Sequence, residues 1–329
     1  MLGIFRTNQL MMGVVLLGYA LLLHLSWFWQ VVPPVNAEPG LGNSLVVPWL
    51  LAHAGWQLPV IIFLLFLQGM LANNIVFTHR LAGSVNLFPG VFVVLLGSLL
   101  PAFLGYSGYL AANVFLLLAL RSMLLTFRVN SAADLIFNTG FWIGMAAFFV
   151  PTYLFFLLPI SITLTILKSG KFRDQFMLLI GALLPLYLAA MGCYWYDQLP
   201  LYWDQQWGAG FALPQYIDWA TLPLVSTGVM VVITGVVLMS QAQYLAKTKM
   251  EVQTKISVLY WLLLGSLLGV LWAMPWGVYR WQAVVPVAGI LLSFNFTKAR
   301  PPVAEAWHLL LLLLMLILHF SAIYQLFPV

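Results

Sequence analysis

Charged residues are scarce in this chain. Only 6% of its 329 residues are Asp, Glu, Lys or Arg, whereas a soluble globular domain carries roughly a quarter. Eight acidic and thirteen basic side chains are too few to solvate the surface of a protein of this length. The shortage excludes a soluble enzyme and a disordered chain, and the lack of any basic run or motif excludes a nucleic-acid-binding protein.

Cysteine and short catalytic motifs are also nearly absent. Cys193 is the only cysteine, so the chain has neither an intramolecular disulfide framework nor a cysteine-based metal site. It contains no HExxH pattern, glycine-rich phosphate loop or nucleophile elbow. The first apolar run, residues 11–29, has no small-residue cleavage site, which predicts a retained anchor rather than a cleaved signal peptide.

Apolar sequence takes the place of charge. Hydrophobic residues make up 63% of the chain, and its mean hydropathy is +1.01. Because a membrane-spanning helix needs roughly 20 apolar residues, these runs predict an all-α polytopic membrane protein with about eleven transmembrane helices in a single domain, residues 1–329. The predicted spans are 10–31, 58–78, 87–105, 108–127, 134–150, 152–168, 175–193, 221–243, 256–275, 281–296 and 304–325.

The basic residues predict the orientation. With a cytoplasmic N-terminus, twelve of the thirteen Lys and Arg residues fall at inner helix ends and Arg280 alone falls outside, which matches the positive-inside rule. We therefore expect a multi-pass protein of a bacterial inner membrane, with long outer loops at 32–57 and 194–220. The carboxylates on the outer side are Glu38, Asp197, Asp204 and Asp218. A functional site is accordingly expected on the outer side.

The outer loop 194–220 is rich in aromatic rings, which make up nine of its 27 residues. One interpretation is an interfacial aromatic belt. The other is a sugar-binding surface, because flat rings stack on sugar C–H faces while neighbouring amides and carboxylates bind the hydroxyls. The candidate contacts from this loop and from residues 274–282 are Asp197, Tyr202, Trp203, Asp204, Trp207, Asp218, Trp276, Tyr279 and Trp281.

Arg280 and Glu38 are the charged candidates for the chemistry itself. Arg280, flanked by aromatic residues, can bind a lipid phosphate bidentately, or serve as an interface anchor or as the partner of an outer Asp. Glu38 is a candidate general base, with a merely solvated carboxylate as the alternative. After it, Ser44–Trp56 is expected to form a short amphipathic helix in the interface.

Histidines are the weaker candidates. His53 lies in the first outer loop, His24 in the first span, and His308 and His319 in the last span. Ionisable groups within spans are functional candidates by default. The alternative for them is a neutral imidazole hydrogen-bonded to a neighbouring helix.

Part of the chain resembles a known family. The run LFPGVFVVLLGSLLPAFLGYSGYLAANVFLLLALRSMLL, followed by FNTGFWIGMAAFFVPTYLFFLLP, resembles the glycosyltransferase-C superfamily, the membrane glycosyltransferases that depend on polyprenyl-phosphate sugars. The elements that carry the likeness are Pro101, Tyr106, Ser107, Gly140, Gly144 and Pro151. The long first outer loop and a later short outer loop bearing an Arg also fit. The resemblance covers about the first 190 residues (core 1–193).

The resemblance implies a fold and a reaction. The fold is a bundle of about 11–13 helices with a cavity at the outer leaflet, and the reaction moves a sugar from a lipid phosphate to an acceptor. Glu38, preceded by Ala37, stands alone where the family carries an Asp–Glu pair. Asn113 is the polar residue nearest the position of a second Asp, and Val150 replaces a frequent Lys. These departures imply a degenerate bacterial member, and the resemblance leaves a divalent metal cofactor open.

Three functions follow as hypotheses. The first is glycosyl transfer from a polyprenyl phosphate sugar to an envelope acceptor. The second is a non-catalytic subunit that binds the lipid carrier or scaffolds an envelope complex of membrane proteins. The third, a lipid or solute transporter, is less favoured because the predicted midplane has no clear carboxylate. The expected partners are membrane lipids and other membrane proteins, and no nucleic acid.

Overall fold

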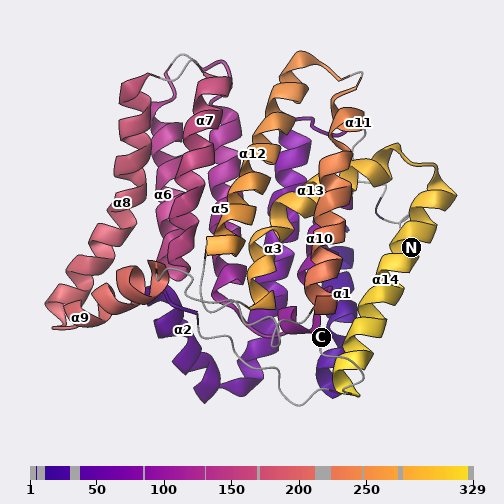
Figure 1. Cartoon of the computed structure of the whole chain (residues 1–329), viewed down its shortest axis with the longest axis horizontal. Coiled ribbons are helices and arrows are strands. Elements are labelled where there is room, and N and C mark those ends of the chain that lie inside the picture. The colour runs from indigo at the N-terminus through magenta and orange to yellow at the C-terminus, as the bar shows by residue number, and fades with distance from the viewer. Residues whose placement is uncertain are drawn as a thin grey trace.

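The computed structural model describes residues 5, 12–29, 38–83, 86–129, 131–168, 171–211, 224–246, 248–272 and 277–324. This part of the chain is predominantly helical and contains no β-strand. Most of its helices run alongside one another between an upper and a lower end (Figure 1). The predicted all-α class is therefore confirmed.

The α-helices are α1 (Met12–Leu23), α2 (Leu41–Ala52), α3 (Gln57–Thr78), α4 (Phe88–Gly97), α5 (Gly108–Leu125), α6 (Ala133–Phe149), α7 (Leu157–Leu167), α8 (Phe172–Trp195), α9 (Leu199–Tyr202), α10 (Leu224–Met239), α11 (Gln241–Leu245), α12 (Met250–Trp272), α13 (Val285–Lys298) and α14 (Pro301–Ile323). Shorter helical segments are η2 (Leu25–Trp29), η3 (Ala54–Trp56), η4 (Pro101–Phe103), η5 (Pro151–Phe156), η6 (Trp203–Gly208), η7 (Ala209–Phe211) and η8 (Val278–Ala283). All of these short segments are 3-10 helices except η6, which is a π-helix.

Every one of the eleven predicted spans contains a helix, but their lengths differ. Within the described residues, six helices are long and apolar enough to cross a membrane. They are Ala54–Thr78, Gly108–Leu125, Phe172–Trp195, Leu224–Leu245, Met250–Trp272 and Pro301–Ile323. The other five predicted spans contain the shorter apolar helices Gly13–Phe28, Phe88–Gly97, Ala133–Phe149, Pro151–Leu167 and Val285–Lys298. A membrane-embedded, multi-pass protein is thus supported, whereas the count of eleven crossings stays a prediction.

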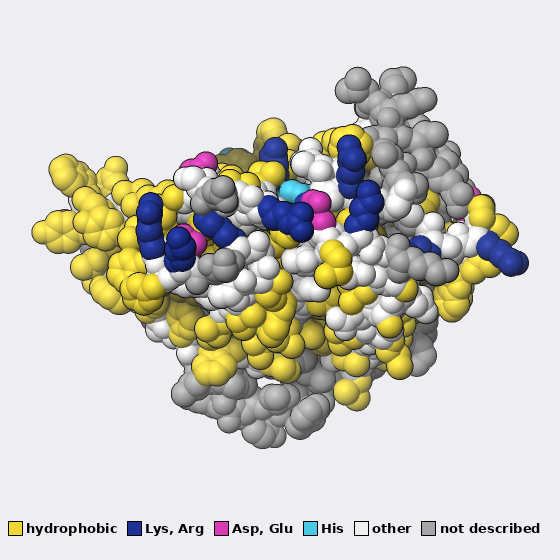
Figure 2. Space-filling view, turned by 90° about the horizontal axis from the view of Figure 1, so that it is seen from above, with side chains coloured by type: hydrophobic (Ala, Val, Ile, Leu, Met, Phe, Trp, Pro, Cys, Tyr) yellow, Lys and Arg dark blue, Asp and Glu magenta, His cyan; other side chains and the backbone are white. Residues whose placement is uncertain are grey.

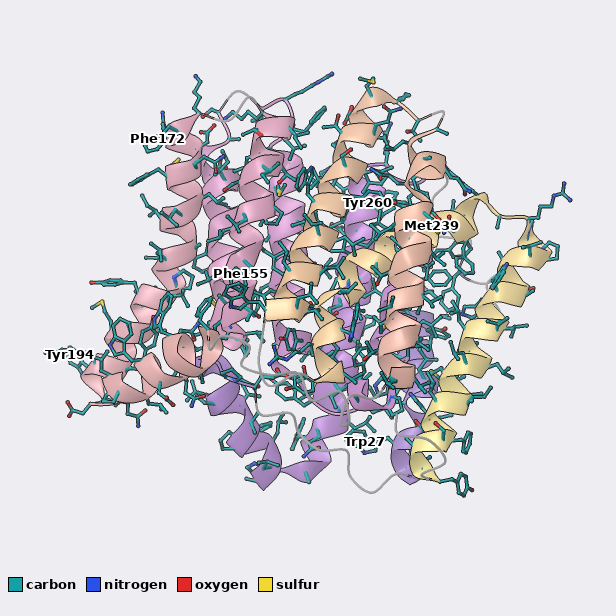
Figure 3. All side chains as sticks on the ribbon, viewed as in Figure 1. Trp27, Phe155, Phe172, Tyr194, Met239 and Tyr260 are labelled. Carbon is teal, nitrogen blue, oxygen red and sulfur yellow. The ribbon has the colours of Figure 1, made fainter. Side chains whose placement is uncertain are left out.

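The outside of the bundle is apolar, as a lipid environment requires. Phe172, Tyr194 and Met239 are 82%, 71% and 87% exposed and project away from the helices (Figure 3). In contrast, α4 is buried along its whole length, packed among α1, α3 and α13. A helix that is apolar on all sides belongs in such an interior position.

Glycines bring α6 and α8 into backbone contact. A Cβ on Gly140 would lie 2.1 Å from the Leu178 carbonyl oxygen, and one on Gly144 would lie 2.2 Å from the Ala182 carbonyl oxygen. Small residues four apart allow membrane helices to approach this closely. The two glycines of the family-like stretch therefore serve helix packing.

Histidines attach α14 to the rest of the bundle. Tyr19 of α1 hydrogen-bonds His308 through its hydroxyl, with Oη 2.9 Å from Nε2. The His319 Nε2 donates to the Ser98 carbonyl at 3.0 Å, while its Nδ1 lies 2.9 Å from the Ser26 hydroxyl. The histidines of the last span thus form inter-helix hydrogen bonds, as the structural alternative predicts.

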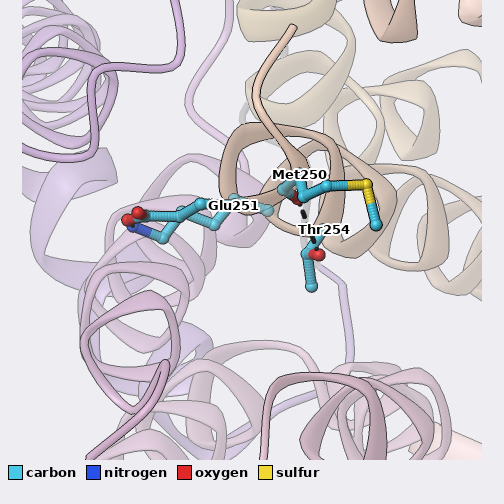
Figure 4. Close-up of polar contacts among 4 residues, drawn as sticks. Met250, Glu251 and Thr254 are labelled. Atoms are coloured by element: carbon cyan, nitrogen blue, oxygen red, sulfur yellow. Dashed lines mark hydrogen bonds and ion pairs between the residues drawn. The ribbon is translucent and has the colours of Figure 1, made fainter.

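Basic side chains gather at one end of the bundle. Figure 2 looks down on the upper end of Figure 1 and shows Lys and Arg spread across it. At the start of α12, Lys255 Nζ lies 2.6 Å from Glu251, and the Thr254 hydroxyl donates to the Met250 carbonyl at 2.9 Å (Figure 4). The grouping agrees with the sorting of charges by sequence. That this end faces the cytoplasm stays a prediction.

Candidate functional site

Glu38 and Arg280 meet inside the bundle at the end opposite the basic face. Glu38 precedes α2, which lies at the lower end of Figure 1, and Arg280 belongs to η8 between α12 and α13. Their exposed fractions are 6% and 2%. Burial raises the pKa of the Glu38 carboxyl to about 8, and the nearby Arg280 charge partly opposes that rise. Glu38 accepts the Gly108 N–H, and Ser107 donates to Gln282, so these two charged groups, far apart in the sequence, lie in one buried centre.

The start of α5 holds the carboxylate of Glu38. The Gly108 N–H donates to its Oε2 at 2.9 Å, and a Cβ at Gly108 would lie 3.0 Å from that oxygen. Ser107 caps the helix, because its hydroxyl accepts the Tyr109 N–H at 3.1 Å. The partial positive charge of a helix N-terminus favours an anion at this position. The Tyr106-Ser107 turn of the family-like stretch thus lies directly against Glu38.

Gly40 lets the Glu38 loop approach α6. It adopts a φ of 142°, and a Cβ there would lie 2.1 Å from the Phe149 carbonyl oxygen. Both the backbone conformation and the close approach require glycine. The predicted interface helix then follows as α2 and η3, although α2 begins at Leu41 rather than at Ser44.

A hydrogen-bonded network surrounds the Glu38–Arg280 centre. The Ser107 hydroxyl donates to Gln282 Oε1 at 2.7 Å. The Asn113 amide donates to the Gln282 carbonyl at 2.8 Å and accepts the Tyr153 hydroxyl at 2.6 Å. All four residues are buried. The network joins α5 and η5 to η8 and so fixes the segment that carries Arg280.

Several buried N–H donors of η8 have no hydrogen-bond partner in the described part of the chain. They are Arg280 Nε and Nη1, Trp281 Nε1 and Gln282 Nε2. Glu38 Oε1 likewise has none there. Unpaired buried polar atoms are costly and uncommon in folded proteins. Their concentration around Glu38 and Arg280 marks the centre as a place for a polar ligand.

Aromatic rings flank the guanidinium. The Arg280 Cζ lies 6.0 Å from the centre of the Tyr279 ring. The Tyr279 and Tyr109 ring centres are 6.4 Å apart, and Tyr109 and Tyr153 are 5.9 Å apart. Burial raises the pKa of Tyr279. Of the two rings predicted to flank Arg280, Tyr279 has a cation–π contact with its guanidinium in the described part of the chain.

The aromatic loop that contains η6 packs on the bundle through a buried glutamine. Gln206 is fully buried, donates to the Ala147 carbonyl at 2.7 Å and accepts the Leu41 N–H at 3.4 Å. Trp207 stacks on Phe211 with ring centres 5.7 Å apart. The loop is thereby joined to the end of α6 and to the start of α2, three residues beyond Glu38.

The other residues of this loop that were predicted to contact a sugar differ in their exposure. Tyr202 is buried and Trp207 is half-buried, whereas Asp197, Trp203 and Asp204 are exposed. Asp204 accepts a hydrogen bond from its neighbour Gln205 at 3.1 Å. Asp218 and Trp276 lie outside the described residues.

Among the weaker candidates, only Asn113 joins the centre. His24 is buried in the first predicted span and donates through Nδ1 to the Ala20 carbonyl at 3.0 Å. His53 is exposed and stacks on Trp49 with ring centres 5.1 Å apart. Neither histidine has a described contact with Glu38 or Arg280.

Sequence reasoning missed Ser107, Gln282 and Tyr153 as site residues. A Ser before an apolar helical run is a typical N-cap signal, so the position of Ser107 at the start of a helix could have been predicted. Gln282 closely follows Arg280. Tyr153 lies in an apolar run, where no local pattern distinguishes it from a membrane-facing aromatic.

Replacing Tyr153 with Phe tests the network. The variant removes one hydroxyl and leaves the Asn113 oxygen buried without its donor, which is expected to lower the free energy of unfolding by about 1–3 kcal/mol. Thermal or denaturant unfolding in detergent measures the change. The matched control is Tyr187→Phe on α8, where the side chain is 60% exposed. Equal effects of the two variants would contradict the hydrogen bond.

A divalent metal does not fit this centre. Glu38 is the only acidic side chain among the described residues of the network, and the cationic Arg280 lies beside it. Hard divalent ions prefer several oxygen ligands that include carboxylates. No group of three or more His, Cys, Asp or Glu in the described part of the chain is placed to hold a metal.

Comparisons of the chain with protein-family models, with curated proteins and with solved structures find no match. The function of the centre is therefore inferred from its own groups. Glu38 can accept or release a proton near neutral pH, and a guanidinium with two unpaired donor atoms can bind an oxyanion. A carboxyl and a guanidinium placed together suit chemistry between a hydroxyl and a phosphate.

Proposed function

We propose that this chain is a glycosyltransferase-C-like protein that binds a polyprenyl-phosphate-linked sugar at the outer leaflet and transfers the sugar to an envelope acceptor. The observation that carries the proposal is the burial of Glu38 and Arg280 in one hydrogen-bonded centre: Glu38 accepts the Gly108 N–H, and Ser107 beside it donates to Gln282, two residues after Arg280. The Tyr106-Ser107 turn and Asn113, which the family resemblance also singles out, lie in the same centre. Separate elements of the resemblance therefore converge in space.

Arg280 is the proposed phosphate ligand. Its Nε and Nη1 are free of partners in the described part of the chain, and a guanidinium can bind two phosphate oxygens at once through two N–H donors. Burial strengthens such a contact, because the attraction between opposite charges is screened less in a low-dielectric interior than in water. Binding here would place the lipid-linked phosphate beside Glu38.

Glu38 is the proposed general base. The acceptor hydroxyl gives its proton to the carboxylate while its oxygen attacks the anomeric carbon. The bond between that carbon and the phosphate oxygen breaks, and its electron pair leaves on the polyprenyl phosphate, which Arg280 stabilises. A base titrating near the working pH is effective, and the pKa of Glu38 is about 8.

Arg280→Gln tests the phosphate contact. We expect the variant to bind radiolabelled farnesyl phosphate, in protein reconstituted into nanodiscs, at least about tenfold more weakly, since a hydrogen bond to a charged group contributes about 1.5–3 kcal/mol. Arg300→Gln is the matched control, because Arg300 is exposed at the basic end. Farnesol, which lacks the phosphate, should not distinguish wild type from Arg280→Gln. Equal farnesyl phosphate affinities for all three proteins would overturn the role of Arg280.

The catalytic step needs a separate test. In a strain deleted for this protein, Glu38→Gln is expected not to restore the envelope glycan profile, although the variant still binds farnesyl phosphate. Full complementation by Glu38→Gln would show that this carboxyl is not the base.

A second function is favoured by one contact. The Glu38 Oε2 accepts the Gly108 N–H, so the carboxyl also has a structural role at the start of α5. A non-catalytic subunit that binds the lipid carrier and scaffolds an envelope complex would need no base. Farnesyl phosphate binding with full complementation by Glu38→Gln, together with co-purifying membrane proteins, would select this alternative.

A further inference from the structure

A large groove runs along α10 from the first residues of that helix to the basic end of the bundle. It has a volume of about 930 Å³ and runs between α10, α13 and α14. This volume falls in the range of small-molecule sites, roughly 300–1,000 Å³. The walls formed by α10 and α14 include exposed apolar residues such as Val232 and Leu310. The groove is therefore open to the surroundings of the bundle.

The lining changes character along the groove. The walls away from the basic end are apolar, formed by residues such as Val225 and Leu314. Polar groups cluster toward the basic end, where Ser240, Asn295 and Lys298 line it. On α14 the lining runs from 303 to 314, about 16 Å at the rise of an α-helix. This α14 wall is about half as long as a hydrocarbon core roughly 30 Å thick, whereas the opposite wall extends further, from Leu224 at the start of α10 to Gln243 in α11.

A second cavity adjoins the polar end of the groove. It has a volume of about 560 Å³, is lined by residues 81–83, α11 and α13, and shares Gln243 and Lys298 with the groove. The hydroxyl of Tyr244, which also lines it, is buried and has no hydrogen-bond partner in the described part of the chain. The apolar groove thus continues into a space that contains a buried hydroxyl without a hydrogen-bond partner among the described residues.

Lys298 lies between the two spaces. Its Nζ donates to the Gln243 carbonyl and lies 5.9 Å from the centre of the Tyr244 ring. No Asp or Glu is among the described residues that line either cavity. The charge at the junction is therefore positive and complementary to an anion.

We propose that this groove binds one anionic glycerophospholipid of the leaflet next to the basic face. The acyl chains occupy the space between α10 and α14, and the phosphate reaches Lys298 at the junction with the second cavity. Basic residues at a membrane surface attract anionic headgroups. Such a lipid would fill the space between α14 and the helices α10 and α13. The site does not depend on the chemistry of Glu38 and Arg280.

Two variants test the site by different routes. Lys298→Gln removes the charge. Gly228→Leu places a side chain into the groove from α10, where a new Cβ meets no atom within 4 Å. The matched controls are Lys171→Gln, an exposed lysine on the same basic face, and Gly192→Leu on α8, which also meets no atom within 4 Å.

The measurement is native mass spectrometry of protein from mixed vesicles of phosphatidylglycerol and phosphatidylethanolamine. We expect wild type and both controls to retain one phosphatidylglycerol through delipidation. Lys298→Gln should retain it about fivefold less, the change that one cation near an anionic lipid gives, and Gly228→Leu should retain none. Equal retention of both lipids, unchanged retention in either test variant, or a dimer that occupies the groove in place of lipid would overturn the proposal.

Discussion

Glu38→Gln is expected to remove most of the loss of stability that the wild-type protein suffers as pH rises. Burial raises the pKa of this carboxyl from its usual 4.5 to about 8. Between those values the folded protein keeps a proton that the unfolded chain has released, so raising the pH favours unfolding. Each pH unit between the two pKa values lowers the free energy of unfolding by about 1.4 kcal/mol. Above the folded-state pKa the total loss of stability reaches about 5 kcal/mol. Gln cannot ionise and keeps an oxygen for the Gly108 N–H.

Far-UV circular dichroism of thermal unfolding, recorded in detergent from about pH 5 to about pH 9, measures this difference. The wild-type and variant midpoints should agree at the acidic end and separate progressively above neutral pH. Asp204→Asn is the control, because that carboxyl is exposed at the same end of the molecule and its removal should leave the wild-type profile unchanged. A Glu38→Gln profile parallel to wild type would show that the carboxyl is not buried in the folded protein.

Gly144→Leu is expected to disrupt the packing of α6 on α8. A Cβ at Gly144 would lie 2.2 Å from the Ala182 carbonyl oxygen, and this neighbour is backbone that cannot rotate away. The helices must separate, which weakens packing along their whole contact. Overpacking costs about 1–3 kcal/mol and sometimes more, and we expect the upper part of that range, about 3 kcal/mol.

The unfolding midpoint and the size-exclusion profile in detergent measure this effect. Gly192→Leu on α8 is the control, because its new Cβ meets no atom within 4 Å, and its stability should stay within about 0.5 kcal/mol of wild type. A Gly144→Leu protein that unfolds with the wild-type midpoint would show that α6 and α8 are not in backbone contact. Such a result would leave the Glu38–Arg280 centre untouched, since the nearest neighbours of a Cβ at Gly144 are Ala182 and Pro185 of α8.

Most helical segments could be predicted from the sequence, whereas the roles of individual polar residues could be predicted only in part. The run 87–105 predicts a full span, but α4 ends at Gly97 and the chain continues through η4 to the Ser107 cap. Hydropathy does not reveal such a break, because residues 98–107 are mostly buried and mostly apolar. The exposure of Asp197, Trp203 and Asp204 could not be predicted either, since composition alone does not indicate which side of a loop packs against the protein.

Sequence by itself determined that this is an all-helical membrane protein, where its helices lie, and that its cations gather at one end. These properties follow from length, hydropathy and charge, which act segment by segment in a bilayer. Only the tertiary structure decided that Glu38, Arg280, Ser107, Asn113, Gln282 and Tyr153 share one buried centre. That meeting depends on how residues 38–40, the start of α5, η5 and η8 pack together, and contacts between distant segments leave no periodic signal in the chain.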